Sequence, residues 1–260
     1  MADEVEKAVL CSLDASPNGY LADPHLKAQA THYLQQVSSS PEVWKLALQH
    51  FTHSSYVQVK FWALQVLSDF VNSDRVSTLT PTEQGILREE LTKWVTSATG
   101  NREAYLKNKL SYAFVCLIRR DYPEQWPGCF QHLVKAVQGS DVGSGDGALD
   151  MLCRILATLD EEVISLEFTR SSEEIATATR IKDALKIDCL ATIVELFYRS
   201  ADGAQEAAAA PPLLKEDEHA WVAWEERQRI SGSCIDTLQR FIGWIDIGMV
   251  ANPAALSLLM

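Results

Sequence analysis

The chain has 260 residues, of which 47% are hydrophobic and 22% charged, a balance typical of a folded protein and not of a disordered one. Its 35 acidic residues outnumber its 23 lysines and arginines, so the formal net charge is −12. This charge argues against a general nucleic-acid coat, which would be basic, and favours contact with a basic protein surface.

The sequence carries no signal for secretion or for membrane insertion. The longest apolar stretch, LSYAFVCLI (110–118), is far shorter than the ~20 residues of a membrane helix. The acidic start MADEVEKAVL lacks the basic region of a signal peptide. Since the compartment is then reducing, we expect the six dispersed cysteines to be small buried hydrophobes and not disulfides or zinc ligands.

Apolar residues recur at helical spacing, and few stretches alternate as a strand would. Capping or proline signals mark four helix starts: Ser40-Pro41-Glu42, Thr80-Pro81-Thr82-Glu83, Gln125-Trp126-Pro127 and Ser171-Ser172-Glu173-Glu174. They lie near residues 41, 81, 126 and 171, so the intervals are 40, 45 and 45 residues. A period of ~40–47 residues holding two helices is typical of HEAT repeats.

We therefore predict an all-α fold, a HEAT-repeat α-solenoid with a right-handed superhelix of about five and a half antiparallel helix pairs. In chain order the predicted pairs are 3–14 with 24–38, 41–54 with 55–72, 81–98 with 102–121, 126–138 with 145–165, and 171–200 with 219–248. A sixth pair begins at Asn252-Pro253 and meets the chain end, so we expect a piece of a longer protein. Residues 139–147 predict a glycine-rich turn, and residues 201–217 a flexible insertion.

The second helices of the second and third pairs have an apolar and a polar side. In 55–72 we expect a buried stripe of Val57, Phe61, Leu64, Leu67 and Val71. The opposite side carries Gln58, Trp62, Gln65 and Asp69. In 102–121 the expected stripe is Leu106, Leu110, Ala113, Phe114 and Leu117. Its opposite side carries Asn108, Tyr112, Val115 and Arg119, flanked by Lys109.

Such polar faces with one large aromatic residue each are typical of protein recognition. Two alternatives stay open for Trp62 and Tyr112, which could instead pack against a neighbouring repeat. Lys60 lies near the apolar stripe, where its stem could reach the edge of the helix. Residues 101–120 are basic, with five cations (Arg102, Lys107, Lys109, Arg119 and Arg120) against Glu103 alone.

We find no motif for catalysis, phosphate binding or a cofactor in the sequence. His50 and His53 stand three residues apart on one helix, but no clear third metal ligand follows. We therefore expect neither an enzyme nor a metal protein.

Two segments carry a resemblance to a known family. VKFWALQVL (59–67) and YLKNKLSYAFVCLIRRDYPEQWP (105–127) resemble the importin-beta-like N-terminal region of nuclear transport receptors, the karyopherins. EEIATATRIKDALKIDCLATIVELFYRS (173–200) and FIGWIDIGMVAN (241–252) are similar to segments of the exportin-T family of tRNA export receptors. The resemblance extends from about Asp23 to Met260.

The resemblance implies a monomeric receptor that shuttles between nucleus and cytoplasm, with Ran-GTP, tRNA and FG-repeat nucleoporins as partners. It implies that residues 1–138 bind Ran and that residues 139–260 are exportin-T-type repeats, with further repeats beyond. Carried over residue by residue, it implies Ran contacts at Lys60, Trp62, Gln65, Asp69, Asn108, Lys109 and Tyr112. The basic helix could alternatively contact tRNA phosphates, which we expect at Lys107 and Arg119. Rival functions are a permanent HEAT scaffold and a transport receptor for a protein cargo.

Overall fold

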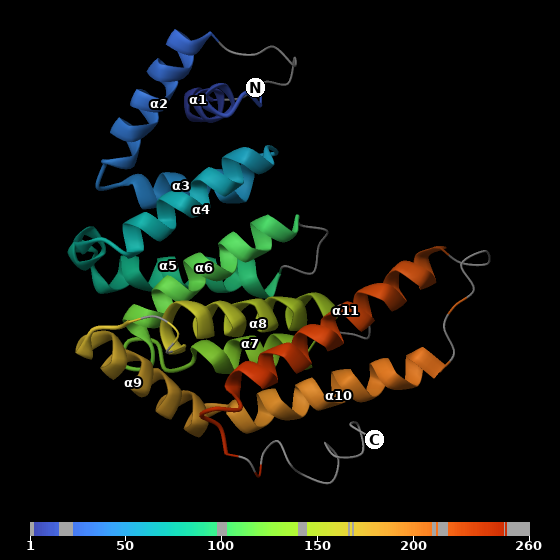
Figure 1. The fold of residues 1–260 in the computed structure, drawn as a ribbon. Coiled ribbons are helices and arrows are strands. Elements are labelled where there is room, and N and C mark those ends of the chain that lie inside the picture. The colour runs from blue at the N-terminus through green and yellow to red at the C-terminus, as the bar shows by residue number, and fades with distance from the viewer. Residues whose placement is uncertain are drawn as a thin grey trace. The chain divides into compact units, whose positions relative to one another are not determined.

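The structure is a computed structural model that describes residues 3–15, 23–97, 103–139, 145–165, 167, 169–209, 212, 218–246 and 248. These residues form helices joined by short turns, with no β-strand among them (Figure 1). None of the described helices is both long enough and apolar enough to cross a membrane. The predicted helix start at Asn252 and most of the predicted glycine-rich turn lie outside the described residues.

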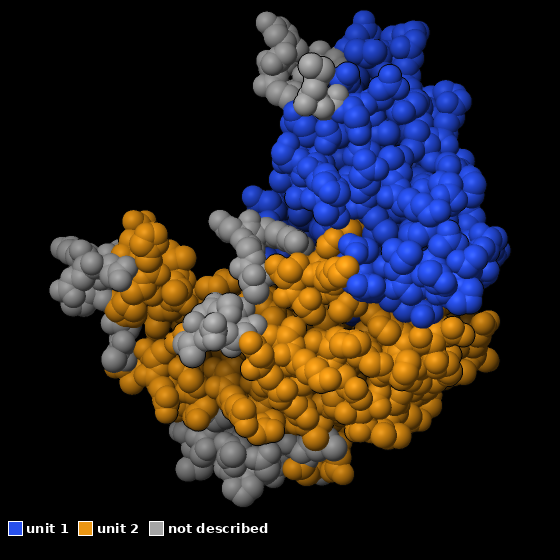
Figure 2. All heavy atoms as spheres, turned by 180° about the vertical axis from the view of Figure 1, so that it is seen from behind, with its two compact units in different colours: residues 1–91, 102–117 blue, residues 92–101, 118–260 orange. Residues whose placement is uncertain are grey.

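The chain divides into two compact units, residues 1–91 with 102–117 and residues 92–101 with 118–260 (Figure 2). The helices that begin in the first unit are α1 (Glu4–Ser12), α2 (Pro24–Ser38), α3 (Val43–His53), α4 (Val57–Val71), the 3₁₀-helix η1 (Asp74–Thr78), α5 (Pro81–Thr96) and α6 (Ala104–Asp121). Helix α1 packs on α2, α3 packs on α4, and α1 also contacts α4. The core between them is apolar because each helix buries one stripe against its neighbour.

The second unit holds α7 (Cys129–Gln138), α8 (Gly145–Leu159), the π-helix η2 (Asp160–Ile164), α9 (Ser172–Asp188), α10 (Leu190–Ala209) and α11 (Glu218–Phe241). Helix α7 packs on α8, and α11 packs on both α8 and α10. Helix α9 contacts η2, α7 and α10. Buried Tyr122 joins this core, where its ring meets Phe130 edge-on with centroids 5.0 Å apart.

The predicted fold class is confirmed, since helix pairs follow one another at the expected positions. Both predicted capping boxes form. At Thr80 the backbone N–H donates to the Glu83 carboxylate at 3.0 Å, and the Glu83 N–H donates back to Thr80 Oγ1 at 3.3 Å. At Ser171 the corresponding distances to Glu174 are 2.7 and 3.2 Å. These bonds satisfy backbone donors that a helix start leaves unpaired.

Two of the four marked helix starts are misplaced, by two and by three residues. Helix α3 begins at Val43, and Ser40 Oγ accepts a hydrogen bond from the Glu42 N–H at 3.3 Å in the turn before it. Helix α7 begins at Cys129, three residues after the predicted start at 126. The reason is that proline also suits turns, so each of these prolines occupies the turn that leads into the helix.

The predicted long helix 171–200 is two helices, α9 and α10, which meet at Cys189. The buried residues explain the break. Helix α9 buries Ala178, Ile181 and Leu185, whereas α10 buries Leu190, Ile193, Val194 and Phe197. At ~100° per residue these two stripes would point ~135° apart around one straight helix. The chain therefore has to change direction to bury both.

Helix α10 extends to Ala209, into the segment for which we predicted a flexible insertion. Alanine has the highest helix propensity of any residue type, so the run of alanines favours this extension. Helix α11 supports it, because Gln228 Nε2 donates to the Ala204 carbonyl at 2.8 Å and Trp224 Nε1 to the Ala207 carbonyl at 3.2 Å. Of the rest of the predicted insertion, residues 210, 211 and 213–217 lie outside the described residues.

We predict that Tyr122→Phe lowers the free energy of unfolding by about 1–2 kcal/mol. The fully buried Tyr122 hydroxyl donates to Asp188 Oδ2 at 2.6 Å, and phenylalanine leaves that carboxylate without this donor. Urea unfolding measures the loss. The matched control is Tyr105→Phe, because that side chain is 49% exposed and should change stability by less than about 0.5 kcal/mol. Equal losses of stability in the two variants would show that the hydrogen bond from Tyr122 to Asp188 does not stabilise the fold.

Candidate protein-binding face

Helix α4 leaves one strip of its surface uncovered. It buries Val59, Ala63, Leu64, Val66, Leu67, Ser68, Phe70 and Val71. Of the predicted stripe, Leu64, Leu67 and Val71 are confirmed as buried, whereas Val57 is half-buried. The predicted polar side is confirmed: Gln58 and Asp69 are exposed, and Trp62 and Gln65 are half-buried. Gln65 Nε2 donates to Asp69 Oδ1 at 2.8 Å, which holds the carboxylate on this strip.

The part of α6 in the first unit, residues 104–117, is enclosed more fully. All five residues of its predicted stripe are buried. Val115, which we predicted on the outer side, is 2% exposed, so that prediction is wrong. Ser111 is also buried, and its hydroxyl donates to the Lys107 carbonyl at 3.0 Å. The helix is therefore covered on more than one side, and its open strip narrows to Tyr105, Asn108, Lys109 and Tyr112.

An aromatic cluster joins the two strips. Phe61, which we predicted in the buried stripe of α4, is 37% exposed, so that prediction is also wrong. Its ring turns towards α6, where it lies 6.0 Å from the Tyr105 ring. Lys109 Nζ lies 4.8 Å from the Tyr112 ring centroid and 5.9 Å from that of Phe61. We call Phe61, Tyr105, Lys109 and Tyr112 the α4–α6 cluster. Its ammonium group is within cation–π range of two rings.

Burial lowers the pKa of Lys109 below the ordinary 10.5 of a lysine, whereas the nearby Asp69 carboxylate raises it in part. Removing water from the ammonium group disfavours its charged form, and the opposite charge restores some of that loss. A cation that is already partly dehydrated in the free protein loses less hydration on meeting a partner's carboxylate or carbonyl group. The cluster therefore offers a preformed cation between aromatic rings.

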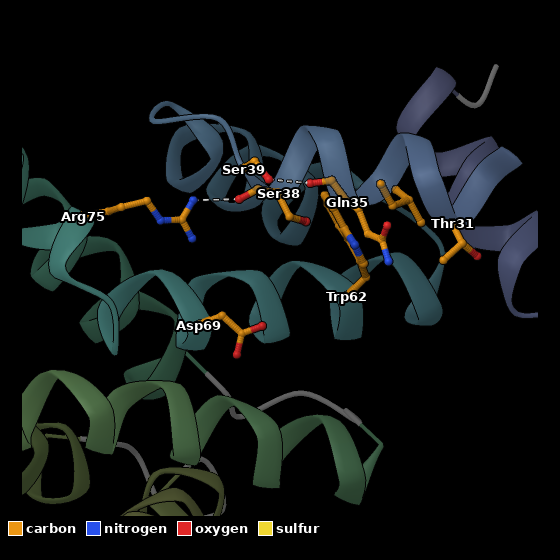
Figure 3. A pocket seen from close by; sticks show the side chains of 8 residues that line it. Thr31, Gln35, Ser38, Ser39, Trp62, Asp69 and Arg75 are labelled. Carbon is orange, nitrogen blue, oxygen red and sulfur yellow. Dashed lines mark hydrogen bonds between the residues drawn. The ribbon is translucent and has the colours of Figure 1, made fainter. Parts of the chain in front are cut away.

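A pocket of about 680 Å³ lies between the open strip of α4 and α2 (Figure 3). It is lined by Thr31, Leu34, Gln35, Ser38, Ser39, Trp62, Asp69 and Arg75. Arg75 Nη1 donates to the Ser38 carbonyl at 2.7 Å and holds one end of the pocket in place. Trp62 packs against the core cluster of α1, α2 and α4, and the buried ring of His50 meets it edge-on at 6.1 Å. Trp62 thus packs against a neighbouring repeat, as one of the two alternatives predicted, and it also lines a surface pocket.

The structure brings most of the predicted Ran contacts together, but not Lys60. Trp62, Gln65 and Asp69 share one side of α4, beside the open strip of α6. Lys60 precedes Trp62 by two residues and so projects ~200° away from it around the helix. It is half-buried there.

The two predicted tRNA contacts are not assembled into a described site. Lys107 is half-buried in the first unit, whereas Arg119 belongs to the second. Arg119 lines a pocket of about 360 Å³ with Arg120, Arg170, Glu162, Glu173, Glu174, Val163 and Thr177. Arginines and glutamates balance in that lining, and Arg170 already donates to three backbone carbonyls. This balance does not favour a phosphate site.

Sequence reasoning missed Phe61 and Tyr105. A signal for Tyr105 was present, because Tyr105, Lys109 and Tyr112 follow the i, i+4, i+7 spacing of one helix face. Among the described residues, no group of three or more histidines, cysteines or acidic residues could hold a metal ion.

We predict that Lys109 titrates below pH 10.5 and that Asp69→Asn lowers its pKa further, because the attraction of the carboxylate is removed. Since the folded pKa lies below the unfolded one, the charge on Lys109 opposes folding at neutral pH, and this cost disappears as pH rises through the folded pKa towards 10.5. NMR titration of the lysine side-chain signals measures both values. An unchanged Lys109 pKa in Asp69→Asn would show that the carboxylate does not act on it.

Comparison with known proteins finds a family that matches this chain. The family described as Exportin 1-like protein matches residues 103–260. Relatives named Exportin-T are 30% identical in Arabidopsis thaliana, 27% in Oryza sativa subsp. japonica and 25% in Homo sapiens, and the matches cover 99%, 99% and 95% of this chain. They cover only 24%, 24% and 23% of those relatives, so the chain spans about a quarter of their length.

Among solved structures, a designed armadillo repeat protein aligns over 89% of this chain and 98% of its own, with 13% identity and a TM-score of 0.31. The resemblance to exportin-T found in the motifs is confirmed by the relatives above. With more than half of its length matched by one family, this chain belongs to the Exportin 1-like protein family.

Proposed function

We propose that the chain is the Ran-binding part of a nuclear export receptor for tRNA. The family, the relatives named Exportin-T and the resemblance of the 59–67 and 105–127 segments support this function. Ran in its GTP form would bind the first unit, and tRNA would be held mainly by residues outside this chain. The protein would act in nucleus and cytoplasm, pass the pore through contacts with FG-repeat nucleoporins, and perform no chemistry itself.

The α4–α6 cluster is the observation that carries the Ran assignment. Interface hot spots are enriched in aromatic residues and in cations that lose water on binding. The cluster combines Tyr105 at 49% and Phe61 at 37% exposure with a partly dehydrated Lys109. Asp69 adds an opposite charge, so the face can meet both signs of charge on a partner.

The face extends from the cluster across α4 to the pocket beside α2. Trp62 and Asp69 line that pocket and belong to the same strip of α4 as Gln65. A rigid aromatic wall with polar groups at its end suits the side chain of a protein partner. We therefore propose that Ran contacts the open strip of α4 along both of its edges, through the cluster and through the α2–α4 pocket.

Export requires that Ran and tRNA favour each other's binding. Such coupling is a free energy shared between two sites, typically ~1–3 kcal/mol, and it is reciprocal. Loss of Ran after GTP hydrolysis would then weaken the hold on tRNA and release it in the cytoplasm. The chain supplies the Ran side of this cycle, in keeping with its net charge of −12, which does not favour a polyanion.

We predict that Tyr105→Ala and Lys109→Met each weaken binding of Ran loaded with a non-hydrolysable GTP analogue by about tenfold. Both changes remove groups of the cluster, and the methionine keeps the buried stem of the lysine while deleting its charge. Isothermal titration of the 260-residue chain measures the affinity. Lys135→Met on the exposed surface of α7 is the charge-matched control and should bind as the unsubstituted chain does.

The variant Lys60→Met tests the Ran contact that the resemblance implies at Lys60. The geometry does not support that contact, since Lys60 lies across the helix from Trp62. We expect no loss of affinity in this variant. Equal binding of Ran-GTP and Ran-GDP by the unsubstituted chain would contradict the proposal and favour a permanent scaffold. Normal binding by both cluster variants would place the Ran site elsewhere.

A further inference from the structure

The interface of α8 with α11 is fixed at both ends by ion pairs. At one end the carboxylate of Asp150, 1% exposed, accepts hydrogen bonds from Arg229 Nη2 at 2.9 Å and from Arg154 Nε at 3.0 Å. At the other end Arg240 Nη1 donates to Glu161 Oε1 at 2.8 Å, just beyond the end of α8. The Asp150 carboxylate resists displacement because separating it from its arginines would leave a buried charge unpaired, whereas the exposed Arg240–Glu161 pair contributes less.

Two cysteines face each other between these ion pairs. Cys153 of α8 and Cys234 of α11 have their Sγ atoms 3.5 Å apart, and both side chains are buried. The residue numbers of the facing pairs increase in the same direction along the two helices. The offsets are 229 − 150 = 79, 234 − 153 = 81 and 240 − 161 = 79. The helices therefore run parallel and in register, and the ion pairs hold the two sulfurs opposite one another.

We propose that Cys153 and Cys234 form a redox-sensitive pair, which a peroxide converts into a disulfide that ties α8 to α11. The sulfurs need to approach from 3.5 Å to the ~2.05 Å of a disulfide. Rotation about the side-chain bonds of two facing residues can supply a movement of this size without a change in helix register.

The reaction is a two-electron oxidation of the pair. One thiol attacks hydrogen peroxide, which gives a sulfenic acid and one water molecule. The second thiol attacks the sulfenic sulfur, forms the S–S bond and releases a second water molecule. Two thiols and one hydrogen peroxide thus become one disulfide and two waters, and a dithiol reductant reverses the change.

The surroundings make the pair slow to react. The hydrogen bond with Cys234 and burial hold the pKa of Cys153 well above its usual range, so little thiolate is present at neutral pH. Peroxide is small enough to enter during local opening of the core, whereas glutathione disulfide is much larger. The pair should therefore respond to sustained peroxide after the half-buried Cys11 of α1 has reacted.

Peptide mapping by mass spectrometry under non-reducing conditions tests the proposal directly. The full chain is treated with hydrogen peroxide until Cys11 is oxidised and then for several times as long, and we expect a cross-linked peptide that joins Cys153 to Cys234 and disappears on reduction. The cross-link closes a loop of about 80 residues, so the thermal unfolding midpoint should rise by roughly 10 °C and return on reduction. Cys11→Ser is the control and should keep both effects.

Cys153→Ala should abolish the cross-linked peptide and the rise of the midpoint, with Cys234→Ala as the second variant if the first folds poorly. Separate sulfinic acids at Cys153 and Cys234, or two intact thiols at the end of the prolonged treatment, would overturn the proposal. A cross-link from either residue to another cysteine would overturn it as well. None of these outcomes depends on Ran binding.

Discussion

The need of each helix to bury an apolar stripe against its neighbours determines which residues of this protein remain available. A pair of helices cannot enclose its own apolar surface, so consecutive pairs must pack on one another. Helix α4 is covered by α3 on one side and by α1 on another, and eight of its residues are buried. One strip remains open, and the polar and aromatic side chains of the candidate site lie on it.

The same packing gives the site its electrostatic character. Lys109 is close to Phe61 and Tyr112, burial lowers its pKa, and the Asp69 carboxylate offsets part of that fall. A charge that opposes folding is typical of a functional position, because stability alone would favour an apolar residue there. The acidic balance of the whole chain agrees with a protein partner more than with a polyanion.

Much of the fold could be predicted from one-dimensional signals, since capping boxes and apolar spacing act within a few residues. Both capping boxes and the first four helix pairs follow from such local signals. The break at Cys189 was missed because no glycine or proline marks it, although the buried stripe shifts there. The starts at Val43 and Cys129 were misplaced because proline suits a turn as well as a first helical turn.

The site was harder to predict, for reasons that involve neighbouring helices. Spacing along α4 cannot tell which of the adjacent Phe61 and Trp62 faces the core when the helix is covered on two sides. Val115 is buried because α6 packs on more than one side, which its own sequence does not show. Cys153 and Cys234 lie opposite each other only because of the register between two helices about 80 residues apart in the sequence.

Hydrogen–deuterium exchange of the chain, free and with Ran in each nucleotide state, tests the central claim most directly. The account predicts slower exchange on binding Ran-GTP in peptides from α2, α4 and residues 104–117 of α6, with no change for Ran-GDP. Protection confined to α9–α11, or the same protection with both nucleotide states, would contradict the assignment of the α4–α6 face to Ran.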